Sequence, residues 1–235
     1  MIYVIGSGPS GIACSIGLLD KGQKVTMLDV GTQLDTEKRQ KLRALKDDLI
    51  DRNFKHPFKS KLNADLLKLV HNSDFPYRVS DKYVKFFVDG TVDCIPSFAR
   101  GGLSNVWGAA VEKFTMSEFE DWPINYNDIA SYYTNVFKIL KPMTERGSDK
   151  DVTDGMELSE QAFSLLQKFY SNTKSIRELG ISFSPSILAA DFTECVYCGA
   201  CMHGCPKDLI YRTPHTLKEL IKNKNFKYLS GVVVE

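Results

Sequence analysis

The chain has 235 residues, 43% of them hydrophobic, which is enough apolar material for one large packed domain or two small ones. Its 30 basic residues are balanced by 29 acidic ones, so it lacks the positive charge typical of proteins that bind nucleic acid or anionic membranes. No apolar run reaches the roughly 18 residues that a membrane span needs, and the N-terminus does not read as a secretory signal. We therefore expect a folded, soluble, cytoplasmic protein.

The first 30 residues predict a strand, a turn, a helix and a second strand. Residues 2–5 (Ile-Tyr-Val-Ile) form an apolar run typical of a short buried strand, and residues 12–21 have the pattern of a helix that ends at Gly22. Residues 24–30 then predict a second buried strand. This order is typical of a parallel sheet with a crossover helix, so we predict an α/β fold that begins as a Rossmann-like domain.

The turn between strand and helix matches the dinucleotide fingerprint G-x-G-x-x-G at residues 6–11. In this motif Gly6 makes the tight turn, Gly8 admits a diphosphate, and Gly11 lets the helix approach the strand. Asp29 follows 21 residues after Gly8, where a carboxylate can accept hydrogen bonds from a ribose. The cofactor contacts expected here are Gly6, Gly8, Pro9, Ser10, Gly11 and Asp29. The alternative is a glycine-rich turn of another α/β protein, and these residues do not distinguish FAD from NAD.

Residues 35–75 are rich in charge and helical in pattern, which predicts a solvated helical excursion, with a partner-docking helix as the alternative. Residues 83–88 and 91–95 flank Asp89-Gly90 and predict a hairpin, because Asp-Gly between β-forming runs favours a tight turn. Directly after it, residues 100–109 (Arg-Gly-Gly-Leu-Ser-Asn-Val-Trp-Gly-Ala) form a second glycine-rich loop. Its composition indicates that the backbone there comes close to another group.

Further along, residues 128–140 and 158–179 predict helices, separated by a polar stretch at 144–155 that we interpret as a linker. Residues 214–223 predict another helix, and residues 228–235 a final strand. We interpret 1–235 as one incomplete domain. Its core would comprise residues 1–34, about 80–140 and 228–235, with the excursion at 35–75 and a cysteine segment at 190–210.

That cysteine segment has the spacing of the bacterial ferredoxin run, C-x2-C-x2-C-x3-C-P, which predicts an iron-sulfur cluster of the 4Fe-4S or 3Fe-4S type. The four predicted ligands are Cys195, Cys198, Cys201 and Cys205. Whether Cys205 is the fourth ligand stays open, because in two-cluster ferredoxins that cysteine serves the other cluster. Zinc and a metal-free segment are the alternatives. Cys14 and Cys94 are interpreted as small core residues, and His203 as a flanking polar residue.

The second glycine loop, together with residues 121–128 (Asp-Trp-Pro-Ile-Asn-Tyr-Asn-Asp) and Tyr132-Tyr133, resembles the glucose-methanol-choline (GMC) family of flavin oxidoreductases. With the fingerprint, the resemblance covers residues 1 to about 140. It implies that the cofactor is FAD and that the second loop lies along the flavin. The resemblance implies that the flavin is lined by Gly101, Gly102, Ser104 and Asn105. It also implies that Trp107 and Gly108 pack beside the flavin. For Trp107, simple core packing is the alternative.

The resemblance also implies a function: an FAD-dependent dehydrogenase that oxidises a CH-OH group of an alcohol or sugar. Some branches of the family have a cysteine-rich insertion at this point, and a cluster there would pass electrons singly to an acceptor protein. The family's catalytic histidine lies in a C-terminal portion, and none of His56, His71, His203 and His215 matches it, so no catalytic base is assigned. We expect the chain to be the N-terminal part of such a protein. The alternatives are a non-catalytic flavin-binding half that needs a partner chain, and an NAD-dependent reductase with structural zinc.

Overall fold

The computed structural model describes residues 1–45, 50–55, 57, 68–79, 96–144, 153–155, 157–181 and 183–234. The chain divides into two compact units. Unit 1 comprises Met1–Gly108 and Val196–Glu235, and unit 2 comprises Ala109–Cys195. Each unit is described by itself below. Unit 1 contains both ends of the chain and both glycine-rich loops.

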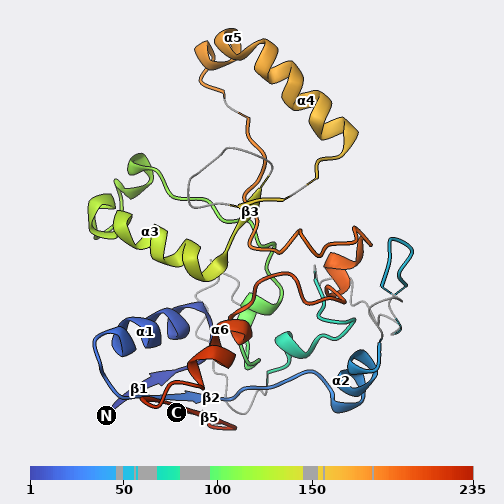
Figure 1. Ribbon diagram of the computed structural model, residues 1–235. Helices are drawn as coiled ribbons and strands as arrows, with labels where there is room; N and C mark the ends of the chain where they lie inside the picture. The colour runs from blue at the N-terminus through green and yellow to red at the C-terminus, as the bar shows by residue number, and fades with distance from the viewer. Residues whose placement is uncertain are drawn as a thin grey trace, which may run out of the picture. The chain divides into compact units, whose positions relative to one another are not determined.

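A parallel three-stranded sheet forms the base of unit 1. Its strands are β1 (Ile2–Ile5), β2 (Val25–Asp29) and β5 (Phe226–Ser230), in the order β1-β2-β5 (Figure 1). The register places Met27 of β2 beside Val4 of β1 and Tyr228 of β5. The predicted α/β class, with a parallel sheet and a Rossmann-like start, is confirmed. The last strand begins two residues earlier than the pattern indicated.

Two helices pack on this sheet and form the main core with it. Helices α1 (Pro9–Asp20) and α6 (Thr213–Leu220) contact each other and lie over the same face of the sheet in Figure 1. Large apolar side chains buried this completely contribute about 1.5–3 kcal/mol each relative to exposure. The buried side chains of this core are Val4, Ile12, Val25, Met27, Leu217 and Phe226.

β1 differs from its prediction as a buried strand. Only Val4 is buried, whereas Tyr3 is 60% exposed and Ile5 is 66% exposed. Successive side chains of a strand point to opposite faces, and the two helices cover one face only, so alternate residues of β1 face outward among the described residues. β2 is buried along most of its length, as its apolar sequence predicted.

Cys14 is also corrected by the structure. The sequence favoured a core position for it, but the residue lies on the exposed side of α1. The helix turns Ile12 and Ser15 inward, and Cys14, which precedes Ser15 by about 100° of helical rotation, faces away from them. Cys94 lies outside the described residues, as does the whole of the predicted hairpin at 83–95.

The rest of unit 1, where the structure describes it, contains one further helix and several short turns. Helix α2 (Thr36–Arg43) is the described helical part of the predicted excursion, and it is shorter than the excursion as a whole. Single 3-10 turns occupy Phe75–Tyr77, Gly102–Asn105 and Ala200–His203. A second apolar cluster lies beside α2 and is formed by Leu34, Val70, Phe75 and Ala99.

Unit 2 is mainly helical. Its elements are a 3-10 turn at Met116–Phe119, α3 (Tyr126–Leu140), β3 (Met143–Thr144), β4 (Thr153–Asp154), α4 (Glu160–Ser171) and α5 (Thr173–Glu178). The predicted 158–179 helix is interrupted at Asn172, and the ends of the predicted linker pair as β3 and β4. Across the described part of the chain, no helix combines the length and the apolar character that crossing a membrane requires.

Candidate dinucleotide site

The first glycine loop has the backbone geometry that its motif predicts. Gly6 follows β1 with a φ of +82°, a conformation that side chains disfavour, and its N–H donates to Leu28 O at 2.8 Å. A Cβ on Gly11 would lie 2.0 Å from Gly6 O, so only glycine allows α1 this close to the turn. The mechanical roles expected of Gly6 and Gly11 are therefore confirmed.

Gly8 is the N-cap of α1 and borders open space. No described atom lies within 4 Å of the position that its Cβ would occupy. No side chain caps the helix, Pro9 stands in its first turn, and that turn contains no acidic residue. Among the described residues, no side chain therefore competes for the amide groups and the positive end of the helix dipole at Ser10 and Gly11, an arrangement suited to an anion such as a diphosphate.

The second glycine loop lies directly beside the first. The backbone N–H of Gly101 donates to Ser7 Oγ at 2.8 Å, a contact between residues 94 positions apart in the chain. A Cβ on Gly102 would come within 3.6 Å of Gly8 Cα. Both Gly101 and Gly102 have positive φ angles, 91° and 55°, which favour glycine. The two loops thus form one continuous backbone surface.

A buried polar network supports this junction. Thr213, the first residue of α6, places its Oγ1 at 2.8 Å from Ser7 O and at 3.2 Å from Gly101 O. Ser104 Oγ donates to Gly101 O at 2.6 Å and accepts from the Thr213 N–H at 3.1 Å. Ser7 is 1% exposed, Ser104 7% and Thr213 2%. Ser104, predicted to line the flavin, therefore supports the backbone of the loop.

Asp29 lies at the end of β2 and takes part in the same network. It is 6% exposed, and its Oδ2 accepts hydrogen bonds from Ser7 Oγ and, at 2.8 Å, from Tyr228 OH. Burial, together with the neighbouring Asp29 carboxylate, raises the pKa of Tyr228 to about 12. Among the described residues no group hydrogen-bonds to Oδ1 of Asp29. This oxygen is the one that could accept a ribose hydroxyl.

Asn105 and Trp107 also hold the second loop in place. Asn105 Nδ2 donates to Gly102 O at 2.7 Å and to Arg100 O at 3.0 Å, so the amide closes the loop on itself. Trp107 Nε1 donates to Tyr211 O at 2.7 Å, and the two rings meet edge to face with centroids 6.5 Å apart. Gly108, the last residue of the first chain segment of unit 1, is exposed.

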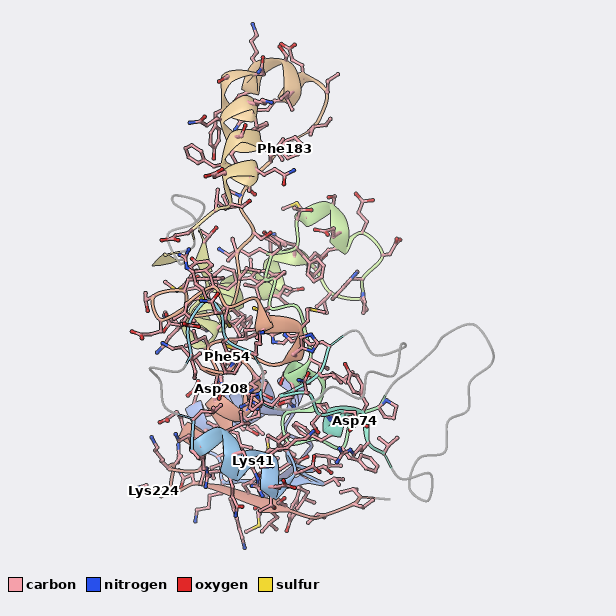
Figure 2. All side chains as sticks on the ribbon, turned by 90° about the vertical axis from the view of Figure 1, so that its right-hand side faces the viewer. Lys41, Phe54, Asp74, Phe183, Asp208 and Lys224 are labelled. Carbon is pink, nitrogen blue, oxygen red and sulfur yellow. The ribbon has the colours of Figure 1, made fainter. Side chains whose placement is uncertain are left out.

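A cavity of about 540 Å³, which we call the basic cavity, adjoins the second loop through Arg100 and Pro214. It contains Asp208, whose carboxylate accepts two hydrogen bonds of 2.9 Å from Arg212 and one contact of 3.1 Å from His215. Burial raises the pKa of Asp208, but these hydrogen bonds outweigh it and lower the pKa overall. Asp208 and residues of α2 line this same cavity, and Figure 2 labels Asp208 and, on α2, Lys41.

The four cysteines of the ferredoxin-like run are thiols divided between the two units. Within the described residues, no group of three or more His, Cys, Asp or Glu side chains is arranged to hold a metal ion. Cys195 ends unit 2, and the other three belong to unit 1, where Cys201 is exposed. Burial raises the pKa of the Cys205 thiol, and Cys201 and Cys198 add to that rise. The three thiols of unit 1 thus interact electrostatically, and the iron-sulfur cluster stays a prediction from the cysteine spacing.

Sequence patterns missed several residues that build the site. Ser7 and Thr213 join the loops, but Ser7 occupies a variable position of the fingerprint and Thr213 belongs to no motif. Lys68 is 8% exposed and donates to Trp107 O at 2.7 Å. Burial lowers its pKa, while Cys201 and Cys205 oppose that shift. A lysine in a polar segment carries no sequence signal for such a position.

The site therefore combines an uncapped helix start, a carboxylate at the end of the neighbouring strand, and a second glycine loop held against the first. All of these features belong to unit 1 and surround the open space at Gly8. Comparison of the chain with models of known protein families found no match, and comparison with curated proteins found none either.

Proposed function

We propose that the protein is an FAD-dependent oxidoreductase of the GMC type that acts on CH-OH groups of an alcohol or sugar. One observation carries the proposal: the open space at Gly8 lies at the uncapped start of α1, and a second glycine loop is held beside it through Ser7. A dinucleotide needs a place for its diphosphate and backbone surface for its extended body, and this arrangement offers both.

The proposal assigns the residues that would hold FAD. The amides of Ser10 and Gly11 would bind the diphosphate, and Oδ1 of Asp29 would accept from the ribose. The second loop, at Gly101 and Gly102, would lie along the rest of the cofactor, as the family resemblance implies. FAD, when bound, supplies the capacity to accept two electrons from the substrate as hydride. No catalytic base is assigned to the described residues.

The most direct test uses Gly8→Ala. Its φ of −66° is ordinary for alanine and no described atom is within 4 Å of the new methyl group, so the variant should fold normally. The methyl group would instead occupy the space needed by the diphosphate, so we expect flavin content to fall about tenfold or more, equivalent to about 1.4 kcal/mol. The control is Gly17→Ala, in the middle of the same helix, where no described atom is within 4 Å either.

Flavin content is measured by absorbance after release from protein purified without added cofactor and after reconstitution with FAD. Equal flavin binding by wild type and Gly8→Ala, with both proteins folded, would contradict the proposed position of the diphosphate. Binding of NAD with no flavin band in any preparation would favour the alternative of an NAD-dependent reductase. Flavin binding with no oxidation of any alcohol or sugar would favour the non-catalytic flavin-binding half.

The iron-sulfur cluster is a separate part of the proposal, and it rests on cysteine spacing alone. It would give the protein a one-electron route to an acceptor protein. Anaerobic purification followed by iron, sulfide and zinc assays tests it, with Cys198→Ser and Cys201→Ser as variants expected to lose the metal. Cys14→Ser is the control, because Cys14 lies on the exposed side of α1. Flavin without iron in the wild type would remove the cluster and leave the flavin proposal standing.

A further inference from the structure

The basic cavity of unit 1 concentrates positive charge from three separate parts of the chain. Five cationic side chains line its volume of about 540 Å³: Arg39 and Arg43 from α2, Arg100 before the second glycine loop, and Arg212 and Lys218 from the region of α6. These elements are distant in sequence, so the convergence is a product of the fold. Like charges brought together in this way repel each other, and a bound anion would relieve that repulsion.

The protein itself neutralises few of these charges. Among the described lining residues, only Asp208 carries a carboxylate, and Arg212 already binds it with two hydrogen bonds. Arg39 donates to Gln33 Oε1 at 3.0 Å and to Thr36 Oγ1 at 3.1 Å, which are both neutral acceptors.

Two guanidinium groups also have unused donors. The Nε atoms of Arg39 and Arg100 are buried without a hydrogen-bond acceptor in the described part of the chain. A buried donor without a partner is costly, so these two guanidinium groups have unmet hydrogen-bonding capacity within the described residues.

The floor of the cavity is apolar. Leu34, Val70 and Phe75 line it and belong to the second apolar cluster, against which Leu42 also packs. A ligand that contacts both the cationic side chains and the apolar floor must combine an anionic group with an apolar or ring-shaped part. Planar guanidinium groups match the oxygens of phosphate well, and several of them together favour a phosphate over a single carboxylate.

We infer that the basic cavity binds a small organic phosphate, and that it is a site distinct from the one proposed for the dinucleotide. The residues that line the cavity include none of residues 6–11 and not Asp29, so a phosphate bound there would not lie at the start of α1. This inference goes beyond the proposed function and does not depend on it. The phosphate could belong to a substrate or to a regulatory metabolite, and the two share the same chemistry of recognition.

The test is calorimetric titration of the purified protein with phenyl phosphate and with inorganic phosphate, with the flavin content of each sample measured in parallel. We expect one phenyl phosphate per chain, bound several-fold more tightly than inorganic phosphate because the ring covers the apolar floor. The double variant Arg39→Gln/Arg43→Gln should bind at least about tenfold more weakly, since it loses two charge-assisted contacts. The control Lys41→Gln/Lys224→Gln removes the same charge from exposed positions outside the cavity and should bind as wild type.

Thermal unfolding of each variant verifies that it folds. Lys218→Glu, on the exposed side of α6, provides a second variant that should abolish binding if the glutamines disturb α2. The inference would be overturned if the wild type showed no saturable binding of phenyl phosphate. It would also be overturned if the control variant bound phenyl phosphate as weakly as Arg39→Gln/Arg43→Gln. Binding that occurs only in flavin-free protein and disappears on addition of FAD would show that the cavity serves the dinucleotide, and would overturn the claim of a distinct site. If the phosphate belongs to the substrate, a phosphorylated alcohol should reduce the flavin faster than the same alcohol without its phosphate. If the phosphate is regulatory, its addition should change the rate of flavin reduction by a neutral alcohol. Both results support the site.

Discussion

Gly101 donates its backbone N–H to the side-chain oxygen of Ser7 at 2.8 Å, and this bond joins two glycine loops that are 94 residues apart. Ser7 Oγ in turn donates to Asp29 Oδ2. One buried hydroxyl group therefore connects the turn after β1, the end of β2 and the second loop. The geometry of the proposed cofactor site depends on this connection.

Ser7→Ala should separate these three segments. It leaves the Gly101 N–H and one contact of Asp29 unsatisfied in a site where Ser7 is 1% exposed, so we expect a loss of about 1–3 kcal/mol in the free energy of unfolding. Chemical denaturation monitored by circular dichroism measures it. Ser171→Ala is the control, because among the described residues that exposed hydroxyl bonds only to Gln167 O in its own helix. A stability equal to that of wild type would mean that the bridge is not required.

Gly11→Ala tests the close approach of α1 to the turn. Because the new Cβ would lie 2.0 Å from Gly6 O, backbone must move, and we expect destabilisation of about 1–3 kcal/mol with loss of flavin. Gly17→Ala in the same helix should instead stabilise by about 0.5–1 kcal/mol, since alanine favours the helix and no described atom obstructs its methyl group. Melting temperatures of the two variants should therefore move in opposite directions, and a shift of the same sign in both would refute the prediction.

Thr213 provides a test of the network from α6. Thr213→Val preserves the shape of the side chain but removes the hydroxyl that contacts Ser7 O and Gly101 O, so we expect a loss of about 1–2 kcal/mol and weaker FAD binding. Thr213→Ser keeps the hydroxyl and should retain most of the affinity. Fluorescence titration with FAD compares the two. If valine and serine gave the same affinity, the hydroxyl would have no part in shaping the site.

The Tyr228–Asp29 contact predicts a stability loss at alkaline pH. The pKa of Tyr228 is raised to about 12 in the folded protein, against about 10 for an ordinary tyrosine, so the neutral phenol favours folding. This contribution is complete below pH 10 and disappears as the pH rises towards 12. Allowing for partial solvent exposure, we expect it to be about 1–2 kcal/mol.

The comparison uses Tyr228→Phe, with free energies of unfolding measured at pH 9 and pH 11. The fall between the two pH values should be smaller in the variant than in wild type. Burial also raises the pKa of Tyr77 and Tyr211, so part of the alkaline loss should persist. Tyr170→Phe, at an exposed position of α4, should behave as wild type. An identical pH dependence of wild type and Tyr228→Phe would show that the contact does not couple to folding.

The sequence by itself determined the local geometry of the first 30 residues. The spacing of Gly6, Gly8 and Gly11 requires a tight turn and a close helix, and the structure has both at the junction of β1 and α1. Such features depend on backbone sterics within a few residues, and a pattern of glycines records them directly. The helix predicted at residues 128–140 was found for a similar reason, because its periodicity is local. In the structure it begins at Tyr126, after a capping box of Asn125 and Asp128 that the prediction did not include.

Only the tertiary structure decided which distant groups meet. The contacts of Ser7 with Gly101, of Thr213 with both loops and of Tyr228 with Asp29 join residues far apart in the chain, and no motif contains them. The exposure of Cys14 and of β1 was missed because periodicity tells which residues share a face, but not which face is covered. The convergence of five cations on one cavity likewise follows from the path of the whole chain, since charges distant in sequence interact only when folding brings their elements together.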